Sequence, residues 1–283
     1  MRKTFLMCRP DFYDVEYVIN PHMEGNIHNV DKVLAVQQWE NFHQQLSKVA
    51  NVELIDPVPH RPDMVFTANA GLIVDNLAWT SSFSKYERRG EERFWQAWFI
   101  ARGYDTVHIP HDKRSEFFFE GAGDCLCDTN GDYWLGYGPR TSQGAAERIV
   151  KVFGSKPFYL LNLVDPRFYH LDTCFCPLDK GHILCFSPAF STGSFWHFAS
   201  KHGRSSGVAL EDPLPDMIID VDEEDAMAFA CNAVCVGDTI FMPTCSDDLI
   251  NRLQKLGYNV IQVDMSEFIK AGGATKCLTF AIP

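Results

Sequence analysis

The chain has 283 residues, of which 46% are hydrophobic, and a formal net charge of −12. Its acidic balance argues against nucleic acid and anionic membranes as partners. No segment is apolar for long enough to be a signal peptide or a membrane span, so we expect a cytoplasmic protein. The length fits one large domain or two small ones, and we expect a single domain over residues 1–283.

Ten cysteines are present, and in a cytoplasmic protein they are expected to be reduced thiols. Most of them lie in apolar runs as closely spaced pairs: Cys125/Cys127, Cys174/Cys176 and Cys231/Cys235. The CxxC pairs typical of structural zinc sites do not occur. The sequence therefore predicts no metal site, and period-two cysteines on one face of a strand explain the spacing better.

From the N-terminus onward, the chain repeats a unit of helix, strand, polar loop and hairpin. Apolar residues at three- and four-residue steps predict the first helix, over residues 30–49. A strand at 52–55 and a hairpin over 72–79, turning at Asp75-Asn76, follow it. The first unit is therefore complete within about 80 residues.

Four further units show the same order of elements. Their predicted helices cover residues 91–102, 143–153, 195–201 and 247–256. Their predicted strands cover residues 106–109, 158–163, 217–219 and 260–263. We expect the first strand, residues 3–8, to complete the last unit beside a terminal strand at 278–282. Residues 191–215 fit the repeat poorly, and we interpret them as an insertion or a lid-like loop.

One residue occupies the equivalent loop position in each unit, at steps of roughly 45–60 residues. These residues are Asn69, Asp124, Asp172, Asn232 and Cys277. Such a period is typical of a radial array, which would direct five loops at one central pocket. The alternative is an ordinary α/β sheet whose loops end in Asn and Asp because turns favour them. The ring is favoured because these residues precede hairpins in apolar surroundings.

The last of these loops contains a candidate nucleophile. Gly272 and Gly273 lie five and four residues before Cys277. Glycines allow a tight turn or a close approach to a ligand, and a thiol at the end of such a turn can act as a nucleophile. The alternative is a small buried cysteine before a terminal strand.

Motifs along the whole chain resemble those of the guanidino-group-modifying enzymes, a family of arginine deiminases, dimethylargininases and glycine amidinotransferases. In family order they are Pro62-Asp63-Met64-Val65-Phe66, Arg88-Arg89-Gly90-Glu91, Phe119-Glu120-Gly121-Ala122-Gly123-Asp124, Arg140-Thr141-Ser142, His170-Leu171-Asp172-Thr173, and Gly272-Gly273 with Cys277. The resemblance implies a five-bladed α/β propeller (pentein), with pseudo-fivefold ββαβ repeats around a central pocket. Residues 17–26, 65–71 and 168–177 are most similar to the catalytic domain of cyanobacterial-type arginine dihydrolases.

The resemblance also implies roles for individual residues. Cys277 corresponds to the nucleophile, His170 to the general acid/base, and Glu120 to an acid that pairs with the histidine or the guanidinium. Asp172 corresponds to an acid that holds two guanidino nitrogens in a bidentate fork. No metal or organic cofactor is implied.

Three further charged residues complete the expected binding site. Arg88 and Arg140 correspond to arginines that hold the substrate α-carboxylate, although each by itself resembles ordinary solvated charge. Asp124 is either a substrate contact or a structural acid. The expected partner is a small molecule, L-arginine or a related guanidino compound, and a homo-oligomer remains open.

One position departs from the deiminases and dimethylargininases. After Val65-Phe66 those enzymes have an acid that holds the guanidinium, whereas this chain has Ala68 and Asn69. An amide has no charge and offers one acceptor and two donors. Asn20 would supply a second such amide.

This departure favours hydrolysis of L-arginine to ornithine, two ammonia and carbon dioxide through a covalent thiouronium. Deimination to citrulline, hydrolysis of methylated arginine, and arginine binding without catalysis are the alternatives.

Overall fold

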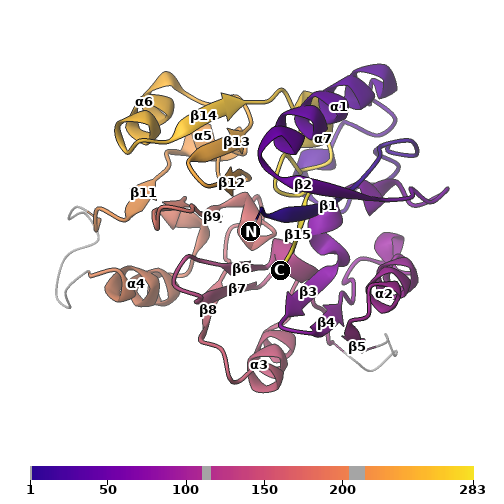
Figure 1. Ribbon diagram of the computed structural model, residues 1–283, viewed down its shortest axis with the longest axis horizontal. Coiled ribbons are helices and arrows are strands. Elements are labelled where there is room, and N and C mark those ends of the chain that lie inside the picture. The colour runs from indigo at the N-terminus through magenta and orange to yellow at the C-terminus, as the bar shows by residue number, and fades with distance from the viewer. Residues whose placement is uncertain (1, 110–115, 204–213) are drawn as a thin grey trace.

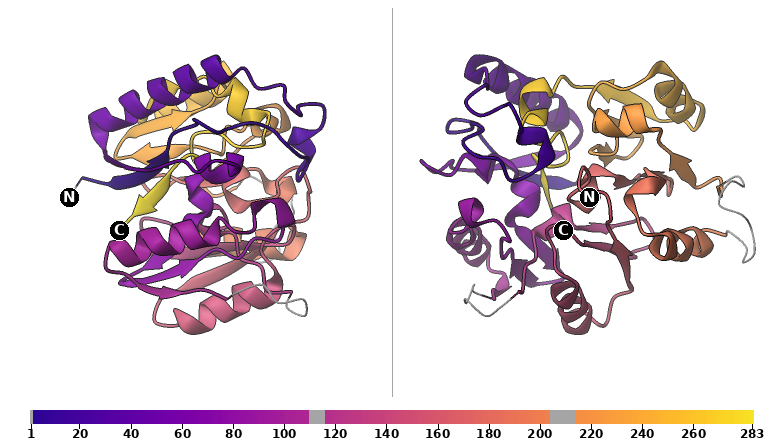
Figure 2. Two further views of the ribbon diagram at one scale, coloured as in Figure 1. Left: turned by 90° about the vertical axis from the view of Figure 1, so that its right-hand side faces the viewer. Right: turned by 180° about the vertical axis from the view of Figure 1, so that it is seen from behind.

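The computed structural model describes residues 2–109, 116–203 and 214–283, and within them the strands form five three-stranded sheets. Figure 1 shows the sheets arranged around the middle of the molecule, with the longer helices on the outside. In this view both chain ends lie near the middle, and the side view in Figure 2 shows that they emerge at one face of the molecule. The fold is therefore an α/β fold of repeated small sheets.

All five sheets share one strand arrangement, in which the second strand of an antiparallel pair is followed by a helix and then by a strand parallel to it. The sheets in chain order are β3 (Gly71–Val74), β4 (Leu77–Thr80) and β5 (Asp105–Val107); β6 (Cys125–Cys127), β7 (Tyr133–Tyr137) and β8 (Phe158–Asn162); β9 (Phe175–Pro177), β10 (Ile183–Cys185) and β11 (Ile218–Asp220); β12 (Val234–Val236), β13 (Thr239–Met242) and β14 (Asn259–Gln262). A parallel pair needs a long crossover, and the helix supplies it.

The fifth sheet joins the two ends of the chain. Strand β15 (Phe280–Ile282) pairs antiparallel with β1 (Thr4–Cys8), with Phe5 opposite Ala281. Strand β1 pairs in parallel with β2 (Asn51–Ile55). This pairing confirms the expectation that the first strand completes the last unit, and it holds in place the loop that contains Cys277, just before β15.

Each sheet has one crossover helix: α1 (Lys32–Val49), α2 (Glu92–Ala101), α3 (Gln143–Val152), α4 (Thr192–Lys201) and α6 (Asp247–Lys255). Local sequence sets where they begin. The side chain of Asp31 accepts hydrogen bonds from the backbone N–H groups of Val33 and Leu34 at the start of α1. Ser246 caps α6 in the same way. Such caps satisfy backbone donors that have no partner within the helix.

Shorter helical segments shape the loops between these elements. They are α5 (Glu223–Met227), α7 (Ser266–Ile269), and the 3₁₀ turns η1 (Pro21–Met23), η2 (Pro62–Val65), η3 (Thr67–Ala70), η4 (Tyr86–Arg88), η5 (Gly121–Gly123), η6 (Leu171–Thr173) and η7 (Ser187–Ala189). The periodicity of the sequence predicted none of them, because a single turn is too short to show a period.

The structure corrects the interpretation of residues 191–215 as an insertion. Ser191 caps α4, which is the regular crossover helix of the β9–β10–β11 sheet. Phe195 and Phe198 on this helix are buried, and the Phe198 ring lies edge-on to Trp134 at 5.1 Å. Residues 204–213 of the expected insertion lie outside the described residues.

The buried apolar side chains of the described residues form four clusters, and each cluster contains one fully buried tryptophan. These are Trp39, Trp79, Trp95 and Trp134. A buried aromatic side chain removes a large apolar area from water, so each tryptophan is a major contributor to its cluster. The clusters fix the sheets, and the sheets fix the loops that carry the candidate site.

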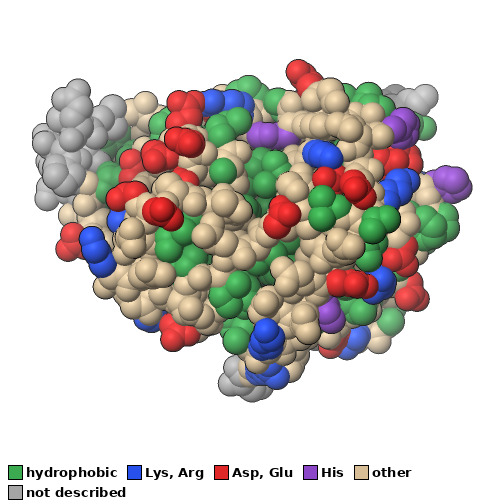
Figure 3. Space-filling model, turned by 90° about the horizontal axis from the view of Figure 1, so that it is seen from above, with side chains coloured by type: hydrophobic (Ala, Val, Ile, Leu, Met, Phe, Trp, Pro, Cys, Tyr) green, Lys and Arg blue, Asp and Glu red, His purple; other side chains and the backbone are tan. Residues whose placement is uncertain are grey.

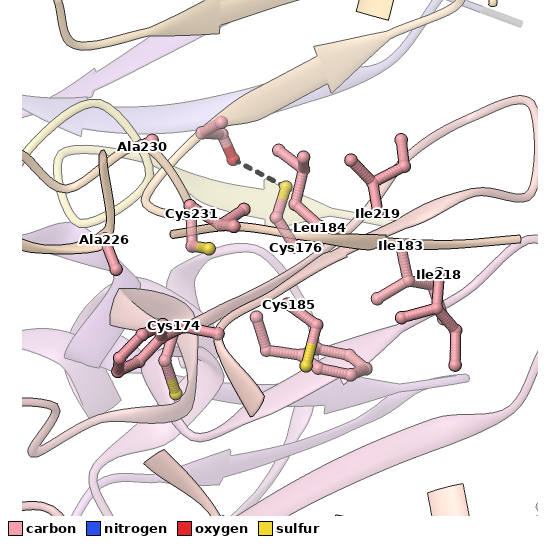
Figure 4. Packing of buried hydrophobic residues seen from close by; sticks show 14 of the residues in the cluster. Cys174, Cys176, Ile183, Leu184, Cys185, Ile218, Ile219, Ala226, Ala230 and Cys231 are labelled. Carbon is pink, nitrogen blue, oxygen red and sulfur yellow. Dashed lines mark hydrogen bonds between the residues drawn. The ribbon is translucent and has the colours of Figure 1, made fainter. Parts of the chain in front are cut away.

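All ten cysteines, each in the described part of the chain, carry free thiols. Five of them belong to the largest cluster: Cys174, Cys176, Cys185, Cys231 and Cys235. Figure 4 shows Cys174, Cys176, Cys185 and Cys231 packed among aliphatic side chains. Burial raises the pKa of these thiols, so they act as small apolar groups.

The surface carries mixed charge. Figure 3 shows acidic, basic and hydrophobic side chains interspersed on the face viewed from above. Among the described residues, no helix is both long and apolar enough to cross a membrane.

Candidate active site

Each of the five equivalent loop residues comes shortly before the first strand of its own sheet, and all five are buried. They are Asn69 before β3, Asp124 before β6, Asp172 before β9, Asn232 before β12 and Cys277 before β15. Hydrogen bonds join these loops to one another. The fold thus brings together residues that are distant in the sequence.

A pocket of about 290 Å³, which includes the part open to solvent, lies among these loops. Six of the nine predicted site residues line it: Asn20, Asn69, Arg88, Arg140, His170 and Cys277. The other three, Glu120, Asp124 and Asp172, lie behind the wall, each in contact with a lining residue. The pocket is therefore lined by polar and charged side chains, and buried carboxylates behind them contact these side chains.

Cys277 is 4% exposed, and its thiol contacts two side chains. Its Sγ lies 3.1 Å from Asn232 Nδ2 and 3.5 Å from Asp172 Oδ2. Burial, with the charge of Asp172, raises the pKa of this thiol well above its usual value. The residue is thus a neutral thiol that donates to Asp172.

The two glycines before the cysteine allow the loop to take this shape. Gly272 has φ of +85°, which an L side chain rarely adopts, and a Cβ there would lie 2.7 Å from Tyr169 Oη. A Cβ on Gly273 would lie 2.6 Å from the ring of Phe66. Close packing against the opposite wall requires glycine at both positions.

His170 is held between two buried carboxylates. Its Nδ1 lies 3.0 Å from Asp124 Oδ2, and its Nε2 lies 3.3 Å from Glu120 Oε2. Burial by itself would lower the pKa of His170, but Asp124 and Glu120 together outweigh it and raise the pKa to about 9. The imidazole is therefore protonated at neutral pH and available as a proton donor.

The second contact of His170 Nε2 suits the neutral form of the ring. Asn69 Nδ2 lies 3.4 Å from this nitrogen and can donate to it once its proton has left. Asn69 Nδ2 also donates to the Glu120 carbonyl at 2.8 Å, and Asn69 Oδ1 accepts from Arg88 Nη1 at 2.8 Å. These partners fix the orientation of the amide. Nε2 therefore has Glu120 as its partner when it carries a proton and Asn69 as its partner when it does not.

Glu120 and Asp124 each have further partners that hold them in place. Glu120 Oε2 accepts from Arg140 Nη1 at 2.8 Å, and its Oε1 accepts from the backbone and hydroxyl of Ser84. Although burial opposes it, the charges of Arg140 and His170 hold the pKa of Glu120 well below its usual range. Asp124 accepts from the Thr141 hydroxyl at 2.6 Å. Asp124 does not line the pocket, but it contacts His170, which does.

The two arginines face the pocket but are already paired with internal carboxylates. Arg88 grips Glu91 with Nε and Nη2 at 3.0 and 2.9 Å, and its guanidinium lies over the ring of Phe83. Arg140 pairs with Glu120 and lies over the ring of Tyr169, 4.7 Å from its centroid. Their positive charges are thus rigidly held at one side of the pocket.

Asn20 belongs to a segment that lines the pocket together with the other site residues. It caps η1, where its Oδ1 accepts from the backbone of His22, and its Nδ2 donates to the Ala271 carbonyl at 3.0 Å. Arg140 Nη2 donates to the neighbouring Ile19 carbonyl at 3.0 Å. These bonds tie the segment to the nucleophile loop and to the arginine side.

Sequence reasoning assigned no role to three residues that the structure places at the site. Asp63 and Tyr169 line the pocket, and Asn232 contacts Cys277. Asp63 Oδ1 is buried without a hydrogen-bond partner among the described residues, while its Oδ2 accepts from the Tyr17 hydroxyl at 3.0 Å. Asp63 lies within one of the motifs, and Asn232 occupies the loop position shared by the five units, so both carried a signal in the sequence.

Comparisons with known proteins agree with this arrangement. Residues 20–283 match the family model described as N,N dimethylarginine dimethylhydrolase, eukaryotic, and the chain belongs to this family. The chain is 37% identical to an N(G),N(G)-dimethylarginine dimethylaminohydrolase of Mycobacterium tuberculosis over 281 residues, covering 99% of this chain and 86% of that protein.

Two cyanobacterial relatives are more similar. The chain is 44% identical over 278 residues to ArgZ of Synechocystis sp., a bifunctional arginine dihydrolase/ornithine cyclodeaminase, covering 98% of this chain. It is 42% identical over 282 residues to AgrE of Nostoc sp., of the same description. The chain spans only 37% and 38% of the lengths of these relatives.

Solved structures place the similarity in one domain of such a protein. The N-terminal domain of ArgZ, bound to product, has a TM-score of 0.92 and 43% identity, covering 100% of this chain and 98% of that domain. Another structure of that domain, covalently bound to a reaction intermediate, also has a TM-score of 0.92.

Proposed function

We propose that this chain is an arginine dihydrolase, which hydrolyses L-arginine to ornithine, two ammonia and carbon dioxide. The observation that carries the proposal is the place of Asn69, an uncharged amide beside His170 on the wall of the pocket that Cys277 also lines. The similarity to the cyanobacterial arginine dihydrolases supports it. The proposal includes a single domain over residues 1–283, built as a closed five-bladed propeller, and a cytoplasmic location.

The substrate binds with its charged ends on opposite sides of the pocket. Arg88 and Arg140 receive the α-carboxylate. Four of the five N–H groups of Arg88 already have protein partners, so one N–H group on Nη1 remains to bind the ligand. The free Oδ1 of Asp63 accepts from the α-ammonium group. Asp172, beside the sulfur, attracts the guanidinium, because carboxylate and guanidinium form a bidentate pair.

The first half of the reaction forms a covalent intermediate. The guanidinium brings positive charge to Cys277, which favours the thiolate over the thiol, and the thiol proton is released to solvent as the substrate binds. The sulfur attacks the guanidinium carbon, and protonated His170 gives its proton to the departing ammonia. The products of this half are one ammonia and a thiouronium that links the sulfur to the side chain.

The second half consumes two water molecules. Neutral His170, its Nε2 accepting from Asn69, takes a proton from the first water as this attacks the thiouronium carbon. The second ammonia leaves and a thiocarbamate remains on the sulfur. The second water releases Cys277 and a carbamate, which breaks down to ornithine and carbon dioxide. Four nitrogens of arginine thus appear as two in ornithine and two in ammonia.

A second candidate is hydrolysis of dimethylarginine to citrulline, which the family description and the mycobacterial relative favour. In that reaction the sulfur leaves at the first water step, before a second nitrogen is lost. Arginine deimination would give citrulline from unmethylated arginine. A protein that only binds arginine would release no product.

Product analysis separates these functions. The protein is incubated with L-arginine and with dimethylarginine, and ammonia, citrulline and ornithine are quantified by chromatography. We expect two ammonia per ornithine from arginine and little citrulline. Equal amounts of ammonia and citrulline, or faster turnover of dimethylarginine, would contradict the proposal. Binding measured by calorimetry without any ammonia release would identify a binding protein.

A further inference from the structure

Both polar atoms of the Asn232 side chain form hydrogen bonds, either to the loop that contains Cys277 or to Asp172 beside it. Its Oδ1 accepts from the backbone N–H groups of Ala274 at 3.0 Å and Cys277 at 3.1 Å. Its Nδ2 donates to the Asp172 carbonyl at 3.0 Å and to Cys277 Sγ at 3.1 Å. The side chain is fully buried, so water does not compete for these bonds.

These partners determine which end of the amide faces the sulfur. Two backbone N–H groups point at one end, and only the oxygen can accept from them. The opposite end meets a carbonyl oxygen, which needs a donor. Reversing the amide would leave donors facing donors and an acceptor facing an acceptor. The NH₂ group is therefore fixed toward Cys277 Sγ.

The backbone around Asn232 makes this donor rigid. Its carbonyl accepts from the Thr275 hydroxyl at 2.7 Å and from the N–H of Lys276 at 3.2 Å. Its own N–H donates to the carbonyl of Phe229, a buried residue with φ of +64°. A bulky side chain in this region is a genuine conformational outlier, and it persists only where the surroundings impose it.

We infer that Asn232 is a further catalytic residue, whose Nδ2–H group donates a hydrogen bond to the thiolate of Cys277 and stabilises the nucleophile. The need for such a donor follows from the geometry. A thiolate at this place would lie 3.5 Å from the carboxylate of Asp172, and like charges repel. A fixed N–H donor on the other side of the sulfur offsets this repulsion, as a preorganised dipole does at an oxyanion.

This inference rests on the proposed function only in taking Cys277 as the nucleophile. Other ionisable groups also face the thiol: Asp172 from η6, Lys276 from the same turn and Tyr169 just before η6, while His170 lines the same pocket. Substituting position 232 removes the Asn232 donor and leaves each of these ionisable side chains in the protein. The thiol can be titrated without turnover of any substrate. The inference about Asn232 and the proposed arginine dihydrolase function can therefore fail separately.

The test measures how fast iodoacetamide alkylates Cys277 as a function of pH. The full chain is used, and the peptide that contains Cys277 is quantified by mass spectrometry to exclude the other nine cysteines. Asn232→Ala removes the donor without adding charge. We expect the pH midpoint of Cys277 alkylation to be about one to two pH units higher in this variant than in the wild type, because a hydrogen bond to a charged group is strong.

Thr279→Val is the matched control. The Thr279 hydroxyl bonds the carbonyls of Thr275 and Lys276 in the same turn, but it contacts neither Asn232 nor the sulfur. We expect a lower melting temperature and an unchanged alkylation midpoint. A midpoint in Asn232→Ala equal to that of the wild type, or an equal rise in Thr279→Val, would overturn the inference.

Asn232→Asp covers the case in which the alanine variant does not fold. It keeps an oxygen for the backbone of Ala274 and Cys277 but places no donor at the sulfur. We expect a midpoint raised by at least as much, because donor loss and added charge act in the same direction. An unshifted midpoint in this variant would also overturn the inference. Retained turnover in Cys277→Ser would instead refute the proposed function and leave the titration result standing.

Discussion

Asp124 Oδ2 lies 3.0 Å from His170 Nδ1, although the two residues are 46 positions apart in the chain. The other oxygen of Asp124 accepts from the backbone of Leu171 at 3.0 Å, which fixes the carboxylate relative to the ring. Since Nδ1 is held on this side, Nε2 faces Glu120 and the pocket. We therefore expect Asp124 to act on the reaction through the histidine.

The first prediction concerns this pair. Asp124→Asn removes a negative charge that raises the pKa of His170, so that pKa falls from about 9. The protonated ring exists below the pKa, so the alkaline limb of ammonia release moves to lower pH. We expect a shift of about one unit or more, measured as kcat against pH.

Asp75→Asn is the control for this experiment. Asp75 lies at an exposed hairpin turn and pairs with Lys156 at the surface. Its pH profile should match that of the wild type. An alkaline limb that stays in place in Asp124→Asn would show that His170 is not the proton donor.

The second prediction concerns the nucleophile. Cys277→Ser should fold, bind arginine and lose turnover, because a serine hydroxyl stays protonated without a strong base beside it. Calorimetry measures binding, and an ammonia assay measures turnover. Cys127→Ser, at an exposed position of β6, is the control and should keep full activity. Substantial ammonia release by Cys277→Ser would exclude the covalent mechanism.

The third prediction concerns the α-carboxylate. Arg88→Ala and Arg140→Ala should weaken the binding of arginine much more than that of agmatine, which lacks this group. Removing one partner of a buried charge pair costs about 3–5 kcal/mol. Both arginines also hold internal carboxylates, so the agmatine measurement corrects for general damage to the site.

Arg102→Ala is the matched surface control, because Arg102 pairs with Glu53 at the surface. It should bind both ligands as the wild type does. Equal losses for arginine and agmatine in Arg88→Ala or Arg140→Ala would show that these residues do not contact the carboxylate.

The fourth prediction concerns the number of ammonia molecules released. Asn69→Asp replaces the Nδ2 donor beside His170 Nε2 with a carboxylate oxygen, which pairs with a cation but cannot donate to the oxygen of a neutral intermediate. We expect the ammonia released per amino-acid product to fall from two toward one, with citrulline appearing.

Asn76→Asp, at the exposed turn between β3 and β4, is the control for this change and should keep the ratio at two. A ratio of two that persists in Asn69→Asp would show that the amide does not govern the second nitrogen. Quantifying ornithine and citrulline by chromatography decides the outcome.

The sequence alone allowed the elements and their repeat to be predicted. The crossover helices were placed within a few residues, as for residues 30–49 against Lys32–Val49. The exception was the region 191–215, where the sequence predicted a helix only from residue 195, although α4 begins at Thr192. Its first turn, Thr192-Gly193-Ser194, contains no apolar residue, so the periodic pattern starts late there.

The equivalent loop positions were also visible in the sequence, because their spacing repeats with the elements. Asn69, Asp172 and Cys277 could thus be selected without a structure. What each residue contacts could not be. Asp172 touches the sulfur of Cys277 across 105 positions, and Asn232 reaches the same sulfur across 45.

The sequence by itself determined the period, the motifs and the residue types of the site, since these follow from local patterns of apolar and polar residues. Only the tertiary structure decided that Asp124 supports His170 from behind, that Asn232 faces the nucleophile, and that β15 pairs with β1 across the chain ends. Such contacts depend on how five separate loops pack into one centre. The raised pKa of His170 depends on them as well, because burial and neighbouring charge exist only once the chain has folded.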